Sequence, residues 1–278
     1  MVYNPRGFIS GGFRPLLAHW KKISLNPDYR QLQLQQLRLK GTRRFTPFKT
    51  KLWGKAWCGP DYASFLSAFD EIFVNQIYDF VPERENPLIL DCGANIGVST
   101  LFFLKRFPHA RLRAFEADPL VFQYLQTNVD HWTAGEACDV TLDNRAVFTH
   151  YDGVCFSSDG ADAGHIEQNI SANLQRIKSF RLKDILDVPV DFLKLDVEGS
   201  EYEILADCAS ELRNVRQCFV ELHGRPSTPS RFGEAIGILE SAGFRMQIHV
   251  CHAQRRPYRE RTLNAGMDLQ LNVFGVRP

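Results

Sequence analysis

The feature that most limits the possible folds is an alternation of strand-like and helix-like segments from residue 88 onwards. Short apolar runs mark the expected strands, and apolar residues at the spacing of a helical turn mark the helices between them. The expected strands are 88–93, 111–117, 139–148, 190–197, 216–224, 245–250 and 269–277. The expected helices include 99–107, 117–129, 230–243 and one opened by a capping box at Ser200 and Glu203. This order predicts an α/β fold with a parallel, doubly wound sheet.

The first 85 residues differ from this pattern in both spacing and charge. Loose alternation over 31–58 predicts short antiparallel strands, and helical spacing from Tyr62 predicts a helix with Asp61 as its N-cap. Residues 1–55 hold 12 Lys and Arg and one acid, a charge of +11, whereas the other 21 basic and 31 acidic residues give −10. We therefore expect a basic N-terminal extension at 1–85 and a main domain at 86–278.

The basic extension has two open interpretations. It either packs on the acidic main domain or meets an anionic partner or substrate. A second basic run comprises Arg255, Arg256, Arg259 and Arg261, and the Gly- and Asp-rich stretch 157–171 is expected to be a long loop.

The composition excludes several classes of protein. No apolar run approaches the ~20 residues of a membrane span, and the first residues lack the apolar core of a signal peptide. The seven cysteines show no CxxC pair, which argues against a disulfide scaffold or a zinc ribbon. These observations predict a cytoplasmic protein without a membrane span.

Three acids stand where successive expected strands end, namely Asp91, Glu116 and Asp196. The carboxyl ends of strands in an open α/β sheet form the edge at which ligands bind. Lys194 lies two residues before Asp196 and shares its face of the strand, so we expect an ion pair that makes the buried charge tolerable.

The first strand ends in a loop that suits a nucleoside-containing cofactor. Gly93 and Gly97 permit a sharp turn, and the N–H groups of the next helix can bind an anionic group such as a carboxylate. Glu116 follows Gly93 by 23 residues and is placed to accept hydrogen bonds from both ribose hydroxyls. A dinucleotide fold needs G-x-G-x-x-G, but position 95 is Asn. The pattern therefore favours S-adenosylmethionine over NAD.

Several motifs together resemble the FkbM family of S-adenosylmethionine-dependent methyltransferases. They are LILDCGANIGVSTLFF, AFEADP, Asn144-x-Ala146, SFRLKDIL and DFLKLDVEGSEYEIL, in order within about 60–250. The resemblance implies a seven-stranded class I methyltransferase (Rossmann-like) fold, with 86–278 as the methyltransferase domain. It implies O-methylation of sugars, polyketides or other natural products. FEADP departs from the usual FEP and changes the start of the helix.

The resemblance also implies where the cofactor binds. The methionine end would lie in the loop from Asp91 to Gly97, the ribose at Glu116, and the adenine near Asp143 and Asn144. The full expected set is Asp91, Gly93, Ala94, Asn95, Gly97, Glu116, Ala117, Asp143, Asn144 and Asp196.

The expected catalytic residues are Asp196, Glu198 and His223. His223 ends the fifth strand and is a candidate general base, because histidine titrates near ~6.5, although a structural role stays open. Glu198 is placed either to face the site or to stabilise the next helix dipole. Whether Asp196 with Glu198 or Glu221 holds a divalent metal is left open.

These features predict an S-adenosylmethionine-dependent methyltransferase that acts on a small hydroxylated acceptor. An anionic or carrier-bound acceptor stays open, as does methylation of nitrogen or of a macromolecule, and nucleic acid is not favoured. The remaining alternatives are an NAD-type oxidoreductase and a non-catalytic nucleoside-binding protein. The sequence does not determine the oligomeric state.

Overall fold

The structure is a computed structural model, which describes residues 26–157, 165–166, 175–226, 229–254, 256–259, 263–264 and 266–278. Residues 1–25 of the basic extension lie outside the described residues. The same holds for most of the stretch 157–171 and for Arg255 and Arg261.

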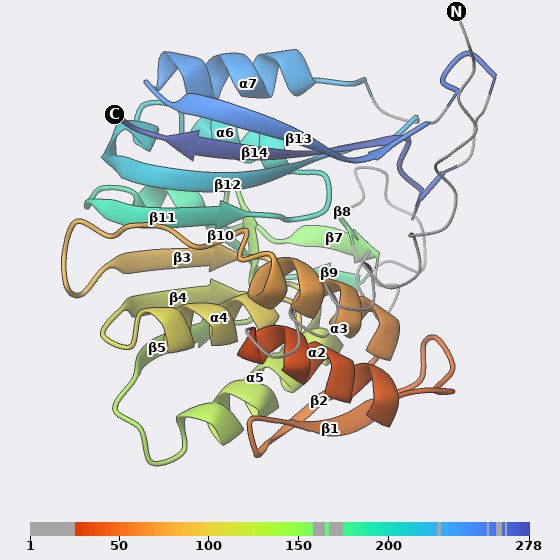
Figure 1. Cartoon of the computed structure of the whole chain (residues 1–278). Coiled ribbons are helices and arrows are strands. Elements are labelled where there is room, and N and C mark those ends of the chain that lie inside the picture. The colour runs from red at the N-terminus through yellow and green to blue at the C-terminus, as the bar shows by residue number, and fades with distance from the viewer. Residues whose placement is uncertain are drawn as a thin grey trace, which may run out of the picture.

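A seven-stranded sheet forms the centre of the molecule (Figure 1). In spatial order its strands are β13 (Arg245–Ala253), β14 (Leu269–Val276), β12 (Val215–Gly224), β11 (Val190–Leu195), β3 (Leu88–Cys92), β4 (Arg111–Phe115) and β5 (Asp139–Asp143). Strands β12, β11, β3, β4 and β5 are parallel, and β14 is antiparallel to both of its neighbours. Numbered along the chain, the order is 3-2-1-4-5-7-6, so the predicted class I methyltransferase fold is confirmed.

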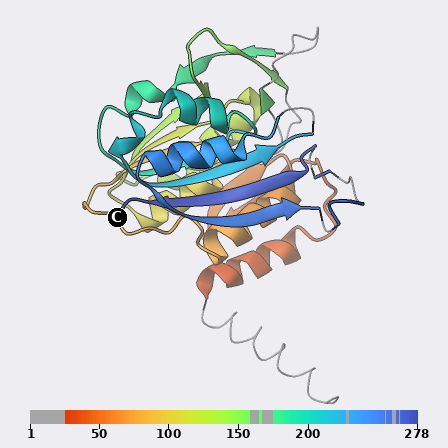
Figure 2. The same ribbon diagram turned by 90° about the horizontal axis from the view of Figure 1, so that it is seen from above.

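Helices cover both faces of the sheet (Figures 1 and 2). One face carries α2 (Pro27–Arg38), α3 (Tyr62–Phe69), the π-helix η1 (Asp70–Val74), α4 (Val98–Arg106) and α5 (Pro119–Thr133). The other face carries α6 (Glu201–Asp207) and α7 (Phe232–Ser241), and short 3-10 turns lie at η2 (Leu182–Ile185) and η3 (Leu212–Asn214). Successive residues of a strand point to opposite faces of the sheet. Phe192 packs against the helices of the first face, and Leu193 packs against those of the second.

The extension shares its core with the sheet. Its hairpin, β1 (Phe48–Leu52) and β2 (Lys55–Gly59), is antiparallel as predicted, and Trp57 and Phe65 are buried in one cluster with Ile89 and Phe192 of the sheet. Among the described residues no helix combines the length and apolar character needed to cross a membrane.

The strand prediction for 31–38 is wrong, because these residues belong to helix α2. Asn26 caps that helix by accepting hydrogen bonds from two backbone N–H groups, and Pro27 occupies its first position. Leu, Gln and Arg, which dominate the segment, also favour helix over strand. The predicted N-cap Asp61 is confirmed, since its side chain accepts a hydrogen bond from the Ser64 N–H at 3.0 Å.

The third predicted strand, 139–148, is two strands. β5 ends at Asp143, and β6 (Ala146–Phe148) instead pairs in parallel with β10 (Ser179–Arg181). β7 (Val154–Ser157), β8 (His165–Ile166) and β9 (Gln175–Ile177) form a small antiparallel sheet beside it. The predicted capping box also fails, because Ser200 makes no side-chain cap to α6.

Candidate active site

The loop between β3 and α4 is a tight left-handed turn at the sheet edge. Gly93, Asn95 and Gly97 all have positive φ, at 86°, 49° and 94°. A Cβ atom on Gly93 would lie 1.7 Å from the backbone oxygen of Asp196, because the ends of β3 and β11 approach each other closely there. Only glycine fits this position, and its presence brings the loop and Asp196 to one place.

Lys194 links the same two strand ends from behind. Its ammonium group is 3.1 Å from Asp196 Oδ2 and 3.6 Å from Asp91 Oδ1, and it donates to the Gly93 carbonyl at 2.7 Å. The two carboxylates raise the pKa of Lys194 and so hold it charged despite its burial. The expected Lys194–Asp196 pair is confirmed, and Asp91 is a second partner that the sequence did not reveal.

Glu116 is a buried acid that connects three elements. Its two carboxylate oxygens accept hydrogen bonds from the N–H groups of Asn95 and Asp118, each at 2.8 Å. Burial raises the pKa of Glu116 to about 7. The side chain therefore fixes the end of β4 to the β3–α4 loop and to the N-terminus of α5.

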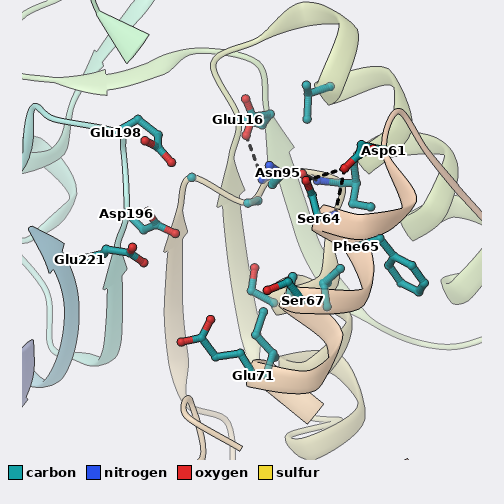
Figure 3. Close-up of a pocket in the computed structure, with 18 of the residues that line it drawn as sticks. Asp61, Ser64, Phe65, Ser67, Glu71, Asn95, Glu116, Asp196, Glu198 and Glu221 are labelled. Carbon is teal, nitrogen blue, oxygen red and sulfur yellow. Dashed lines mark hydrogen bonds between the residues drawn. The ribbon is translucent and has the colours of Figure 1, made fainter. Parts of the chain in front are cut away.

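These elements border a cavity of about 850 Å³ at the edge of the sheet. Gly93, Asn95 and Glu116 line one part of it, and α3 and η1 of the extension line another. Figure 3 shows Asp61, Ser64 and Ser67 on the helix side and Glu198, Asp196 and Glu221 across from them. The cavity is within the size range of small-molecule sites, and it lies at the switch point between β3 and β11.

Besides Asp61, Glu116 and Asp118, four acidic residues line this cavity, namely Asp196, Glu198, Glu221 and Glu71 (Figure 3). Burial raises the pKa of Glu198 to about 8 and also raises the pKa values of Glu221 and Glu71. Glu198 has a φ of 61°, which is uncommon for a residue with a side chain.

His223 lies behind these carboxylates and does not line the cavity. Its side chain is 1% exposed, and Nδ1 is 2.9 Å from Oε1 of the buried Glu201. The nearby carboxylates raise the pKa of His223 well above its ordinary value, against the effect of burial.

Several predicted cofactor residues lie outside the cavity lining. The Asp91 carboxylate accepts hydrogen bonds from Ser99 and Thr100 behind the loop, and Asp143 pairs with Arg145. The Asn144 amide donates to the Glu116 carbonyl at 2.8 Å and to the Ala117 carbonyl at 3.3 Å. Roles for these residues in cofactor binding stay predictions.

The sequence did not single out Glu71, Tyr78 or Glu201. Glu71 and Tyr78 line the cavity from the extension, and Glu201 is buried at the start of α6. The one available signal was an acidic pair, Asp70 and Glu71, within the apolar face of the helix that follows Asp61.

Comparison with family models identifies one family. The methyltransferase FkbM domain matches residues 91–246, which is more than half of the chain. Methyltransferase 1 of Beauveria bassiana (strain ARSEF 2860) is 29% identical over 202 residues, covering 64% of this chain and 80% of that protein. 31-O-demethyl-FK506 methyltransferase FkbM of Streptomyces tacrolimicus is 26% identical over 217 residues, covering 66% of this chain and 82% of that protein.

Among solved structures, methyltransferase FkbM from Methylobacillus flagellatus KT is 16% identical with a TM-score of 0.40, covering 92% of this chain and 60% of that one. The match of the family domain covers the β3–α4 loop, Glu116 and the end of β11, which border one part of the cavity. The chain therefore belongs to the FkbM family of S-adenosylmethionine-dependent methyltransferases.

Proposed function

We propose that this protein transfers a methyl group to a hydroxyl of a small natural product. The observation that carries the proposal is the cavity, in which the glycine loop and Glu116 stand opposite a group of carboxylates. A relative that is 26% identical is named as an O-demethyl-FK506 methyltransferase, which agrees with a hydroxyl acceptor. The acceptor can be a sugar, a polyketide or another hydroxylated metabolite, free or bound to a carrier.

The residues that line the cavity offer hydrogen-bonding groups that fit S-adenosylmethionine. The Glu116 carboxylate borders the cavity and can accept hydrogen bonds from ribose hydroxyls on its remaining lone pairs. The loop from Gly93 to Ile96, including Ala94, lines the cavity and can present backbone groups to the amino-acid end. Asn144 would serve the adenine side indirectly, since it holds the Glu116 and Ala117 carbonyls in place.

When bound, S-adenosylmethionine supplies an electrophilic methyl group, which leaves sulfur as the acceptor oxygen bonds to it. The chain's own task is to position the acceptor and to take the hydroxyl proton. Asp196 and Glu198 face the cavity and are the proposed proton acceptors. A pKa of about 8 for Glu198 places its proton exchange near neutral pH. His223 is buried behind them and would act through them.

An amine acceptor is the second candidate. The carboxylates of Asp196, Glu198 and Glu221, with Glu71 on the facing helix, would attract and orient a protonated amine, although the amine must lose its proton before it reacts. For either acceptor, a hydroxyl or an amine, the two parts of the chain would have the same roles. Residues 86–278 would bind the cofactor, and the extension at 1–85 provides the cavity wall formed by α3 and η1.

The test is methyl transfer from ¹³C-methyl-labelled S-adenosylmethionine to a panel of hydroxylated and amine-bearing metabolites. We expect products whose methyl carbon has the chemical shift of an ether. A shift typical of an N-methyl group would favour the amine alternative. Binding of NAD but not of S-adenosylhomocysteine in calorimetry would contradict the proposal as a whole.

A further inference from the structure

His223 presents an unsatisfied nitrogen to the acidic end of the cavity. Within the part of the chain that the structure describes, Nε2 makes no hydrogen bond, and its side chain is 1% exposed. Buried polar atoms without a partner are rare in folded proteins and call for an explanation, such as an ion or water that completes the site.

The other nitrogen of the ring has a defined role. Oε1 of Glu201 is 2.9 Å from His223 Nδ1 and also accepts hydrogen bonds from the Val197 N–H at 3.2 Å and the Gly199 N–H at 3.0 Å. A carboxylate oxygen that receives these donors is an acceptor, so Nδ1 carries the hydrogen. With Nδ1 held by Glu201, Nε2 is the ring nitrogen that faces the carboxylates, and a cation bound there would take the place of the Nε2 proton.

Three carboxylate oxygens surround that nitrogen at nearly equal distances. Nε2 is 3.6 Å from Glu198 Oε2, 3.6 Å from Glu221 Oε1 and 3.9 Å from Asp196 Oδ1. Charge-assisted hydrogen bonds would be shorter, at about 2.7–2.9 Å. Ligands bound at about 2.1 Å to one cation lie about 3.0–3.4 Å apart, so the side chains would have to draw together around the ion from their present separations of up to 4.8 Å.

The ligand atoms of Asp196, Glu221 and His223 all lie within 4.8 Å of one another. Lys194 pairs with the other oxygen of Asp196, Oδ2, and so leaves Oδ1 directed to this group. The resulting arrangement has the form of a metal-binding histidine whose second nitrogen is fixed by a carboxylate.

We propose that Asp196, Glu221 and His223 bind one divalent cation at the floor of the cavity, and that Glu201 is the positioning residue behind His223. One imidazole nitrogen with two carboxylate oxygens favours a transition metal such as Mn²⁺ over Mg²⁺. The proposal that a cation binds here is argued from these side chains alone, whereas the role of the cation in methyl transfer rests on the proposed function. There, the cation would bind the acceptor hydroxyl and lower its pKa, and a second acceptor oxygen could complete the coordination.

The test is titration of the full chain with Mn²⁺, followed by electron paramagnetic resonance and calorimetry. We expect a single Mn²⁺ per chain, an affinity at least tenfold weaker in Glu221→Gln, and a loss of roughly 10–100-fold in Glu201→Gln. Glu71→Gln is the matched control, because it removes a carboxylate of the same cavity that is outside the proposed ligand set. Its Mn²⁺ affinity should change much less than that of Glu221→Gln.

Two results would overturn the proposal. One is no Mn²⁺ binding, with both ring nitrogens of His223 protonated in ¹⁵N spectra, which would make the group a histidinium held by carboxylates. The other is equal weakening in Glu71→Gln and Glu221→Gln, which would mean that general negative charge attracts the ion. S-adenosylhomocysteine binding, measured on the metal-free protein, separates failure of this site from failure of the proposed function.

Discussion

At the scale of single residues, Glu116 joins ligand recognition to local structure. Its carboxylate accepts hydrogen bonds from N–H groups of the β3–α4 loop and of the start of α5. Substitution of Glu116 should therefore affect both the loop and the proposed ribose site. Its raised pKa, about 7 against an ordinary 4.5, makes this coupling visible as a dependence on pH.

We predict that S-adenosylhomocysteine affinity increases as pH rises from about 5 to about 8 and then levels off. In the free protein Glu116 is largely protonated below its pKa of about 7, whereas ribose hydroxyls donate to the ionised form. Binding should therefore release a proton near neutral pH. The pKa of Glu116 is higher in the folded protein than in the unfolded chain, so the folded state binds the proton more tightly. The free energy of unfolding of the unliganded protein should therefore fall as pH rises from about 4.5 through about 7.

Calorimetry in buffers of different ionisation enthalpy measures that proton release. Glu116→Gln should abolish it and weaken binding by roughly tenfold or more, because a hydrogen bond to a charged group is worth about 1.5–3 kcal/mol. If the folded Gln variant kept both the affinity and the pH dependence, Glu116 would not be the ribose ligand.

The second prediction concerns Asp196. Asp196→Asn should keep the fold and S-adenosylhomocysteine binding while turnover falls by about 10²–10⁴-fold, because the change removes a proposed base and cation ligand with little change of shape. Methyl transfer and thermal melting are measured together. Full activity with a lower melting temperature would mean that Asp196 has only a structural role, as the ion-pair partner of Lys194.

The sequence could predict the acids that end strands but not those that tertiary packing brings to them. Asp91, Glu116 and Asp196 follow from strand periodicity, because a parallel sheet places strand ends at one edge. Glu71 reaches the cavity through η1, and Glu201 reaches His223 across two elements. No local pattern encodes such contacts.

At the scale of elements, helix α2 shows how local pattern can mislead. Leucines at alternate positions resemble a strand, yet the Asn26 cap, Pro27 and helix-favouring residues decide the outcome. Docking then uses polar contacts, because the Gln35 side chain is fully buried and its amide donates to the Lys51 carbonyl at 2.9 Å. The sequence could predict the class of fold, because strands that alternate with helices form parallel sheets with right-handed crossovers, and few strand orders satisfy that rule.

The third prediction tests that docking contact. Gln35→Ala should lower the free energy of unfolding by about 1 kcal/mol, because it removes the hydrogen bonds of a buried side chain to Thr50 and to the Lys51 carbonyl. The loss is moderate because Gln31 and Arg38 also donate to that carbonyl. Gln36→Ala is the control, as it makes the same change at an exposed position of the same helix. Urea unfolding monitors both variants, and equal midpoints would show that α2 docks without this hydrogen bond.

The fourth prediction tests the approach of β3 to β11. Gly93→Ala should destabilise the protein by about 3 kcal/mol or more and prevent S-adenosylhomocysteine binding, since its Cβ would meet the Asp196 backbone. Gly135→Ala is the control, with a φ of 81° and open space around the new atom, so only the backbone cost of about 1–2 kcal/mol applies. Similar melting temperatures for the two variants would contradict this view of the turn.

At the scale of the whole molecule, charge is divided between a basic extension and an acidic main domain. Part of the basic charge is used within the fold, since Arg44 lies 2.8 Å from Asp61 and Lys55 lies 3.6 Å from Glu136. The extension also provides a wall of the cavity, and Arg44 is among the residues that line it. Both interpretations of the extension, packing and capture of an anionic acceptor, are therefore physically reasonable.

The fifth prediction separates these interpretations. If the extension captures an anionic or carrier-bound acceptor, kcat/KM for that acceptor should fall as salt rises, because exposed charges are screened over about 8–10 Å at moderate ionic strength. A neutral acceptor of similar size is the control and should show little dependence on salt, as should S-adenosylhomocysteine binding. Steady-state rates over a range of ionic strength measure the effect. If both acceptors respond alike, the +11 charge of residues 1–55 serves to hold the extension on the acidic domain.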